Sequence, residues 1–124
     1  MAKEWKYFTE DELKCSHTGE CAMDDEFMAM LDAIREECGF PFAVTSAYRS
    51  PQHPVEAKKA KPGAHASGKA VDILANAERA YILIEVALKH GIHRIGIAQK
   101  GDMGSRFIHL DADDSKASPR VWSY

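Results

Sequence analysis

Two segments in the second half of the chain alternate apolar and polar residues, and this pattern limits the fold more than any other feature. In residues 70–74, aliphatic residues stand on either side of Asp72. In residues 106–111, two aliphatic residues alternate with Phe107, His109 and Asp111. Because side chains alternate between the two faces of a strand, each segment is expected to bury its aliphatic face. As neighbouring strands, the two would bring Asp72 and His109 together on an open face.

The remaining elements are predicted from helix caps, apolar spacing and turn residues. Thr9 and Glu12 fit a capping box, and Asn76 is expected to cap the third helix. Asp24 stands with two further acidic residues in the first turn of the second helix, where the helix dipole favours anions. A turn at Asp102 joins the last two strands into a hairpin. The expected helices are 9–15, 24–38 and 76–90, and the expected strands are 42–48, 70–74, 94–98 and 106–111, with a loop at 50–64.

Helices that come first, followed by strands around one more helix, predict an α+β fold with a mostly antiparallel sheet and flanking helices. The 124 residues are expected to form one domain, 1–124, and a monomer. The net charge of -3 argues against a nucleic-acid partner, and no apolar run is long enough to span a membrane. We expect synthesis in the cytoplasm without a signal peptide, and the three cysteines are expected to be reduced thiols.

His65, Asp72 and His109 have the residue types of a zinc site. His65 precedes Asp72 by seven residues, and Gly68 lets the chain turn between them. Two imidazoles and one carboxylate leave the fourth position of a tetrahedral zinc ion free for water, whose pKa the metal lowers. The spacing alone also suits a loop-capping carboxylate and a solvated strand histidine, so both interpretations stay open at this point.

Three ordered motifs resemble one peptidase family. Residues 65–72 match the His-x-x-Gly-x-Ala-x-Asp signature of the zinc D-Ala-D-Ala carboxypeptidase family, which includes bacterial wall peptidases, vancomycin-resistance dipeptidases and phage endolysins. Residues 46–51 look like the aromatic-Arg-Ser segment of this family, and residues 107–111 look like its final ligand strand. Residues 8–15 and 119–122 resemble small phage members. The resemblance covers nearly the whole chain and implies a hedgehog/D,D-peptidase-like fold.

The resemblance implies one Zn²⁺ per chain, bound by His65, Asp72 and His109. Arg49 matches the arginine that binds a substrate carboxylate or carbonyl, with Tyr48 beside it as a substrate-binding residue. The implied activity is hydrolysis of peptide bonds in peptidoglycan stem peptides, of the D-Ala-D-Ala carboxypeptidase or endopeptidase type. A phage-encoded enzyme of this kind would act at the bacterial cell wall after holin release or as a virion component.

The sequence departs from the family pattern at the usual acid–base positions. The residues two and three positions before the last ligand are Phe107 and Arg106, and neither can take that role. Asp111 is the best substitute as general base, because it follows His109 by two residues on the same face, roughly 6–7 Å along the strand. It is equally suited to accept a hydrogen bond from the ring of a metal-bound His109. The weaker candidates for the base are His53, His93 and Asp102.

Several features leave more than one interpretation open. Two interpretations remain for Cys15, His17, Cys21 and Cys38, which form either a second, structural zinc site or simple buried thiols. Similarly, the lysines at 58, 59 and 61 either bind anionic wall polymers or belong to a solvated loop. The aromatic residues Tyr48, Trp122 and Tyr124 either contact substrate or serve in packing. The departures from the family pattern also allow a non-catalytic zinc-containing binding or virion module, because hedgehog signalling domains resemble this chain in the same segment.

Overall fold

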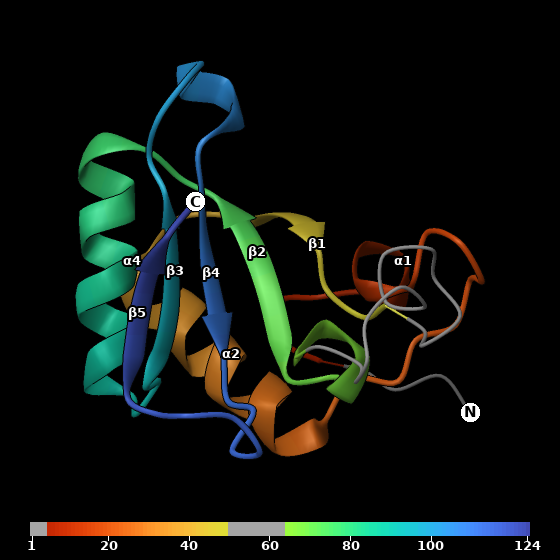
Figure 1. Cartoon of the computed structure of the whole chain (residues 1–124). Coiled ribbons are helices and arrows are strands. Elements are labelled where there is room, and N and C mark those ends of the chain that lie inside the picture. The colour runs from red at the N-terminus through yellow and green to blue at the C-terminus, as the bar shows by residue number, and fades with distance from the viewer. Residues whose placement is uncertain (1–4, 50–63) are drawn as a thin grey trace.

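The computed structural model describes residues 5–49 and 64–124, and these form a five-stranded sheet beside helices. The strands lie in the order β1-β2-β4-β3-β5, and all neighbours are antiparallel except β3 and β5, which are parallel (Figure 1). The predicted α+β fold with a mostly antiparallel sheet is therefore confirmed. The strand bounds are Ala43–Ser46 for β1, Ala70–Leu74 for β2, Arg94–Ala98 for β3, Phe107–Asp111 for β4 and Arg120–Ser123 for β5.

The helices begin where the capping signals predict. The helices are α1 (Glu10–Leu13), α2 (Asp25–Cys38) and α4 (Ala77–Lys89), with 3-10 turns η1 (Ala64–Ser67) and η2 (Met103–Ser105). The capping box before α1 is present, since the Thr9 amide donates to Glu12 Oε1 over 3.1 Å. Asp24 caps α2 by accepting a 2.9 Å hydrogen bond from the Phe27 amide.

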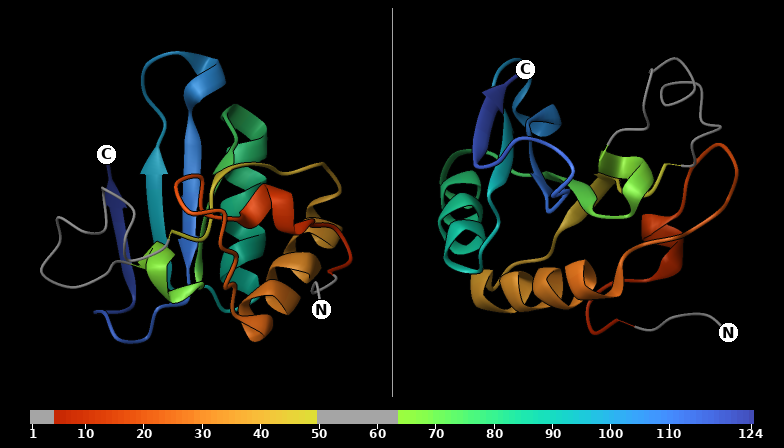
Figure 2. Two further views of the ribbon diagram at one scale, coloured as in Figure 1. Left: turned by 90° about the vertical axis from the view of Figure 1, so that its right-hand side faces the viewer. Right: turned by 60° about the horizontal axis from the view of Figure 1, so that its bottom comes forward.

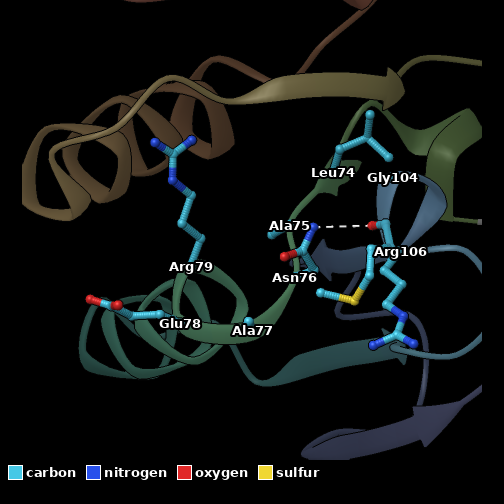
Figure 3. A pocket seen from close by; sticks show the side chains of 9 residues that line it. Leu74, Ala75, Asn76, Ala77, Glu78, Arg79, Gly104 and Arg106 are labelled. Carbon is cyan, nitrogen blue, oxygen red and sulfur yellow. Dashed lines mark hydrogen bonds between the residues drawn. The ribbon is translucent and has the colours of Figure 1, made fainter.

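Two helix predictions need correction. Helix α1 ends at Leu13 and not at Cys15, because the Cys15 amide donates to the Glu20 carbonyl in a tight turn. Asn76 stands before α4 but makes no side-chain cap. Its Nδ2 donates instead to the Met103 carbonyl over 3.0 Å, which joins the start of α4 to η2. A hollow of about 320 Å³ lies at this junction, and none of the three candidate metal ligands lines it (Figure 3).

The aliphatic residues of the sheet share one face, and the helices supply the other half of the core. Helix α4 packs against β4, and α2 packs against α4 (Figures 1 and 2). Burial of a large aliphatic or aromatic side chain contributes about 1.5–3 kcal/mol, so this core is the main source of stability. Its fully buried members include Phe27, Leu31, Ile34, Val71, Ile73, Leu83, Ile108 and Leu110.

The strand predictions are confirmed in position, with two differences. Strand β1 is shorter than the predicted 42–48, and its register against β2 shifts between Val44 and Ser46. Strand β5 was not predicted, since its four residues pair with a strand that lies more than twenty residues earlier. The predicted loop and the lysines at 58, 59 and 61 fall outside the described residues, as does His53. No helix in the described ranges has the length and apolar character to cross a membrane.

Candidate metal centre

One row of residues crosses four strands of the sheet. Asp72 of β2 is the register partner of His109 in β4, and His109 is also the partner of Gly96 in β3. Gly96 is in turn the partner of Trp122 in β5. Register partners lie on the same face of a sheet. The prediction that Asp72 and His109 share a face is therefore confirmed, and the row also includes Trp122.

His65 reaches this face from η1, which directly precedes β2. Its Nδ1 donates a 2.7 Å hydrogen bond to the Ala47 carbonyl. Because a carbonyl only accepts, the proton of the neutral ring is on Nδ1 and the lone pair is on Nε2. His65 Nε2 lies 3.4 Å from Asp72 Oδ1. The ring is thus oriented as in metal sites, where one ring nitrogen donates a hydrogen bond to a backbone carbonyl and the other nitrogen can bind the metal.

Gly68 explains how the chain turns between His65 and Asp72. Its φ angle is +75°, in the left-handed region that favours glycine. An added Cβ would also collide with the Ala22 carbonyl oxygen and would lie 3.1 Å from the Asp24 amide nitrogen. The Gly68 carbonyl accepts a 2.8 Å hydrogen bond from that same amide. The short glycine segment therefore packs directly on the backbone that begins α2.

Ligand atoms of His65, Asp72 and His109 all lie within 4.8 Å of one another. All three side chains are buried, although the sequence predicted an open face for Asp72 and His109. The unpredicted strand β5 accounts for the difference, because the Trp122 ring packs at a centroid distance of 5.2 Å from the His109 ring. Two imidazoles and one carboxylate are a donor set that suits a divalent metal such as zinc, with one position left for water or substrate.

Asp111 lies next to His109 and is fully buried. Its Oδ2 accepts a 2.6 Å hydrogen bond from His109 Nε2. Its Oδ1 accepts a 2.7 Å hydrogen bond from Arg94 Nε and a 3.2 Å hydrogen bond from the Asp113 amide. Both carboxylate oxygens are thus engaged. Arg94 was not among the residues predicted for the site. It lies two residues before Gly96 on the same face of β3 and is the register partner of Asp111.

The carboxylate of Asp72 and the ring of His109 each stabilise the charged form of the other. Burial raises the pKa of the Asp72 carboxyl, but hydrogen bonds from His109 and His65 outweigh burial and hold this pKa well below its usual range. Burial lowers the pKa of His109, but hydrogen bonds to Asp111 and Asp72 outweigh burial and raise it overall. Since His109 Nδ1 lies 2.8 Å from Asp72 Oδ1, a metal ion bound there would replace the Nδ1 proton while Asp111 keeps the Nε2 proton.

The two predicted substrate-binding residues lie just after β1. The Arg49 amide donates to the His65 carbonyl over 3.1 Å, and Arg49 Nε donates to Ser46 Oγ over 3.2 Å. Arg49 and Tyr48 line a hollow of about 230 Å³ together with Ser46. Tyr48 is buried, and burial raises the pKa of its phenol. The Arg49 backbone is therefore attached to His65 in η1, and its side chain is attached to Ser46 at the end of β1.

The other candidates do not join this cluster. Within the described ranges, Cys15, His17, Cys21 and Cys38 form no group close enough to hold a second metal, and the three cysteines form no disulfide there. The His93 carbonyl accepts from the Arg120 amide, and Asp102 begins η2. Neither residue belongs to the metal cluster.

A family model described as Peptidase M15 matches residues 6–111. The chain belongs to the peptidase M15 family. Peptidases of the M15 family are metal-dependent, and in this member the cluster of His65, Asp72 and His109 is the group of side chains suited to the metal. Comparison with curated proteins gives no match. The M15 match ends at Asp111, so β5 and its aromatic residues follow the matched part of the chain.

Proposed function

We propose that this M15 peptidase is a zinc enzyme that hydrolyses peptide bonds in peptidoglycan stem peptides, as a D-Ala-D-Ala carboxypeptidase or endopeptidase. The observation that carries the proposal is the buried cluster of His65, Asp72 and His109, which offers three ligands and leaves a fourth position. A zinc ion bound there would supply a water of lowered pKa and would polarise the scissile carbonyl. Side chains of the protein would orient the metal ligands and bind the substrate.

The protein positions both imidazoles before any metal arrives. The Ala47 carbonyl holds the ring of His65, and the Asp111 carboxylate holds the ring of His109. Rings that are already oriented lose little freedom on metal binding, and a hydrogen-bonded imidazole is a more basic ligand. This arrangement supports a site built for tight metal binding.

Asp111 fits the orienting role better than the role of general base. A general base must reach the proton that it removes, within about 2.6–3.2 Å or through one water. The Asp111 carboxylate is fully buried and already accepts hydrogen bonds from His109 and Arg94. We propose that Asp111 keeps His109 in the tautomer that binds the metal through Nδ1.

Arg49 is suited to hold the substrate. A guanidinium donates two parallel hydrogen bonds to a carboxylate, and it also donates to a carbonyl oxygen. The hydrogen bond between the Arg49 amide and the His65 carbonyl holds the Arg49 backbone next to the segment of the metal ligand. We propose that Arg49 binds the terminal carboxylate or a carbonyl of the stem peptide, in a phage-encoded enzyme that reaches the wall by holin release or within the virion.

Metal analysis combined with digestion of purified peptidoglycan tests the proposal. We expect one zinc per chain and new peptide ends in the mass spectra of the fragments. His109→Ala should lose the zinc and the cleavage, while His93→Ala, at an exposed histidine outside the cluster, should keep both. One zinc without cleavage would favour the non-catalytic binding or virion module instead. A protein without zinc would contradict the ligand assignment.

A further inference from the structure

The last strand places two aromatic rings against the metal centre. In β5, the Trp122 ring centroid lies 5.2 Å from that of His109. The Tyr124 ring centroid lies 5.1 Å from that of Phe107, the residue two positions before His109 on the same face. The Tyr124 amide continues the pairing with β3 by donating to the Ile97 carbonyl over 3.2 Å. Both rings thus lie on the sheet face that carries Asp72 and His109.

Gly96 makes this close approach possible. A Cβ at Gly96 would lie 2.7 Å from Trp122 Nε1 and 2.9 Å from Tyr124 Cε2. The two rings therefore occupy the space that any other residue would fill at the centre of the row. On the far side, the Arg94 guanidinium lies 5.0 Å from the Trp122 ring and also bonds to Asp111. Trp122 is consequently held by His109, Gly96 and Arg94 together.

Tyr124 combines this contact with exposure to solvent. Its side chain is about half exposed, with a relative accessibility of 49%, so it is not a core residue. Trp122 Nε1 and Tyr124 Cε2 both crowd the position that a Gly96 Cβ would take, so the two rings are neighbours over Gly96, the register partner of His109. Burial raises the pKa of the Tyr124 phenol, so the phenol keeps its proton at neutral pH and can donate it.

We infer that Trp122 and Tyr124 form an aromatic wall of the substrate site, in which the Tyr124 hydroxyl donates a hydrogen bond to a carbonyl or carboxylate oxygen of the bound peptide. Trp122 is a positioning residue that holds the Tyr124 ring by packing beside it over Gly96. The inference rests on the proposed peptidase function, which it deepens by naming residues beyond the part of the chain that the family model matches. The substrate group that binds the Tyr124 hydroxyl must be a hydrogen-bond acceptor, and every peptide backbone supplies carbonyl oxygens of this kind.

Tyrosine-to-phenylalanine variants test the inference, because they remove one hydroxyl and keep the ring. Tyr124→Phe should retain the zinc affinity and the thermal stability of the wild type. Its kcat/KM for a soluble stem peptide should fall about tenfold, as expected for one lost hydrogen bond to substrate. Tyr81→Phe, at an exposed tyrosine of α4, is the matched control and should leave the kinetics unchanged.

A double-mutant cycle tests the role of Trp122. Trp122→Leu removes the ring that packs beside Tyr124 and should lower kcat/KM by a similar factor. The variant with both changes should be little worse than either single variant, because both act through the same placement of the Tyr124 hydroxyl. Independent, multiplying effects would overturn the positioning role of Trp122.

A binding titration separates failure of this inference from failure of the proposed function. If the wild type cleaves the stem peptide and Tyr124→Phe cleaves equally well, the inference is wrong and the function stands. If the wild type binds the peptide without cleaving it, the peptidase function is wrong. In that case the inference still requires weaker peptide binding by Tyr124→Phe, and equal binding overturns it. If the wild type neither binds nor cleaves, both are overturned.

Discussion

Gly96 and Trp122 are direct partners in the parallel pair of β3 and β5, and the indole fills the space where the glycine has no side chain. In Gly96→Ala the new Cβ would lie 2.7 Å from Trp122 Nε1, so the indole must move away from His109. We expect a loss of about 1–3 kcal/mol in the free energy of unfolding, as for other overpacked sites. Urea unfolding measures this loss.

Gly104→Ala is the control for that variant. Its Cβ would meet only the flexible Asp102 carboxylate, at 3.3 Å, so the free energy of unfolding should change little. Equal losses in the two variants would show that the close packing of Trp122 on Gly96 does not contribute to stability.

Gly68 and Gly91 form a second matched pair. Both have positive φ angles, of 75° and 92°, so alanine costs about 1–2 kcal/mol in backbone strain at either position. At Gly91 an added Cβ meets nothing within 4 Å, whereas at Gly68 it collides with the Ala22 carbonyl. We expect Gly68→Ala to be clearly more destabilising in thermal unfolding and to weaken zinc binding, since Gly68 lies between two ligands. A similar loss in both variants would contradict this contact.

Arg94 and Asp111 form a buried ion pair, with Arg94 Nε 2.7 Å from Asp111 Oδ1 and the Asp111 side chain fully buried. Arg94→Met leaves this buried carboxylate with His109 as its remaining partner, and the loss of one partner of a buried pair costs up to about 3–5 kcal/mol. Chemical denaturation of the wild type and the variant measures the cost. The control is Lys6→Met, which breaks the exposed pair of Lys6 and Glu36 and should change little, because solvent screens that pair. Comparable small effects in both variants would show that Arg94 is not needed to hold Asp111.

The effect of zinc on stability should increase with pH. The raised pKa of His109 contributes stability to the metal-free protein that is complete below the ordinary histidine pKa of about 6.5 and is lost as the pH rises through the raised value. The lowered pKa of Asp72 contributes stability that is present above about pH 4 and is lost as the pH falls through its folded value. Zinc competes with the His109 proton, so binding strengthens as that proton is lost.

Thermal unfolding with zinc and with a chelator, from about pH 5.5 to about pH 8, tests this linkage. The difference in Tm between the two conditions should grow with pH in the wild type. His109→Ala should show no zinc-dependent difference at any pH. A constant difference in the wild type would mean that zinc does not displace the His109 proton.

Arg49 should act on substrate and not on metal. Arg49→Ala should leave one zinc per chain and should raise KM for a stem peptide, because the guanidinium that holds the substrate is lost. Arg49→Lys keeps the charge but not the forked geometry, so its KM should lie between those of the wild type and the alanine variant. Steady-state kinetics with metal analysis of the same samples provides both measurements. Unchanged kinetics in Arg49→Ala would remove Arg49 from the substrate site.

Local patterns in the sequence were sufficient for most of the fold. The alternation in residues 70–74 and 106–111 predicted two strands that would bring Asp72 and His109 to one face if they were neighbours, and the structure pairs them with Asp72 opposite His109. The helix start at Thr9 was predicted from its capping box, because a cap involves only the next three residues. The start near Asp24 was predicted from the acidic residues of the first turn, and the structure shows that Asp24 is the cap. The cap expected at Asn76 was wrong, because its side chain bonds to a carbonyl in η2, 27 positions away.

The sequence by itself determined the candidate ligands, since the types and spacing of His65, Asp72 and His109 are local properties. Only the tertiary structure decided their surroundings. The packing of Trp122 on His109 depends on β5 pairing with β3, and the engagement of Asp111 by Arg94 depends on β3 pairing with β4. Both pairings join segments that are distant in the sequence, and their energy comes from contacts that no short stretch of sequence contains.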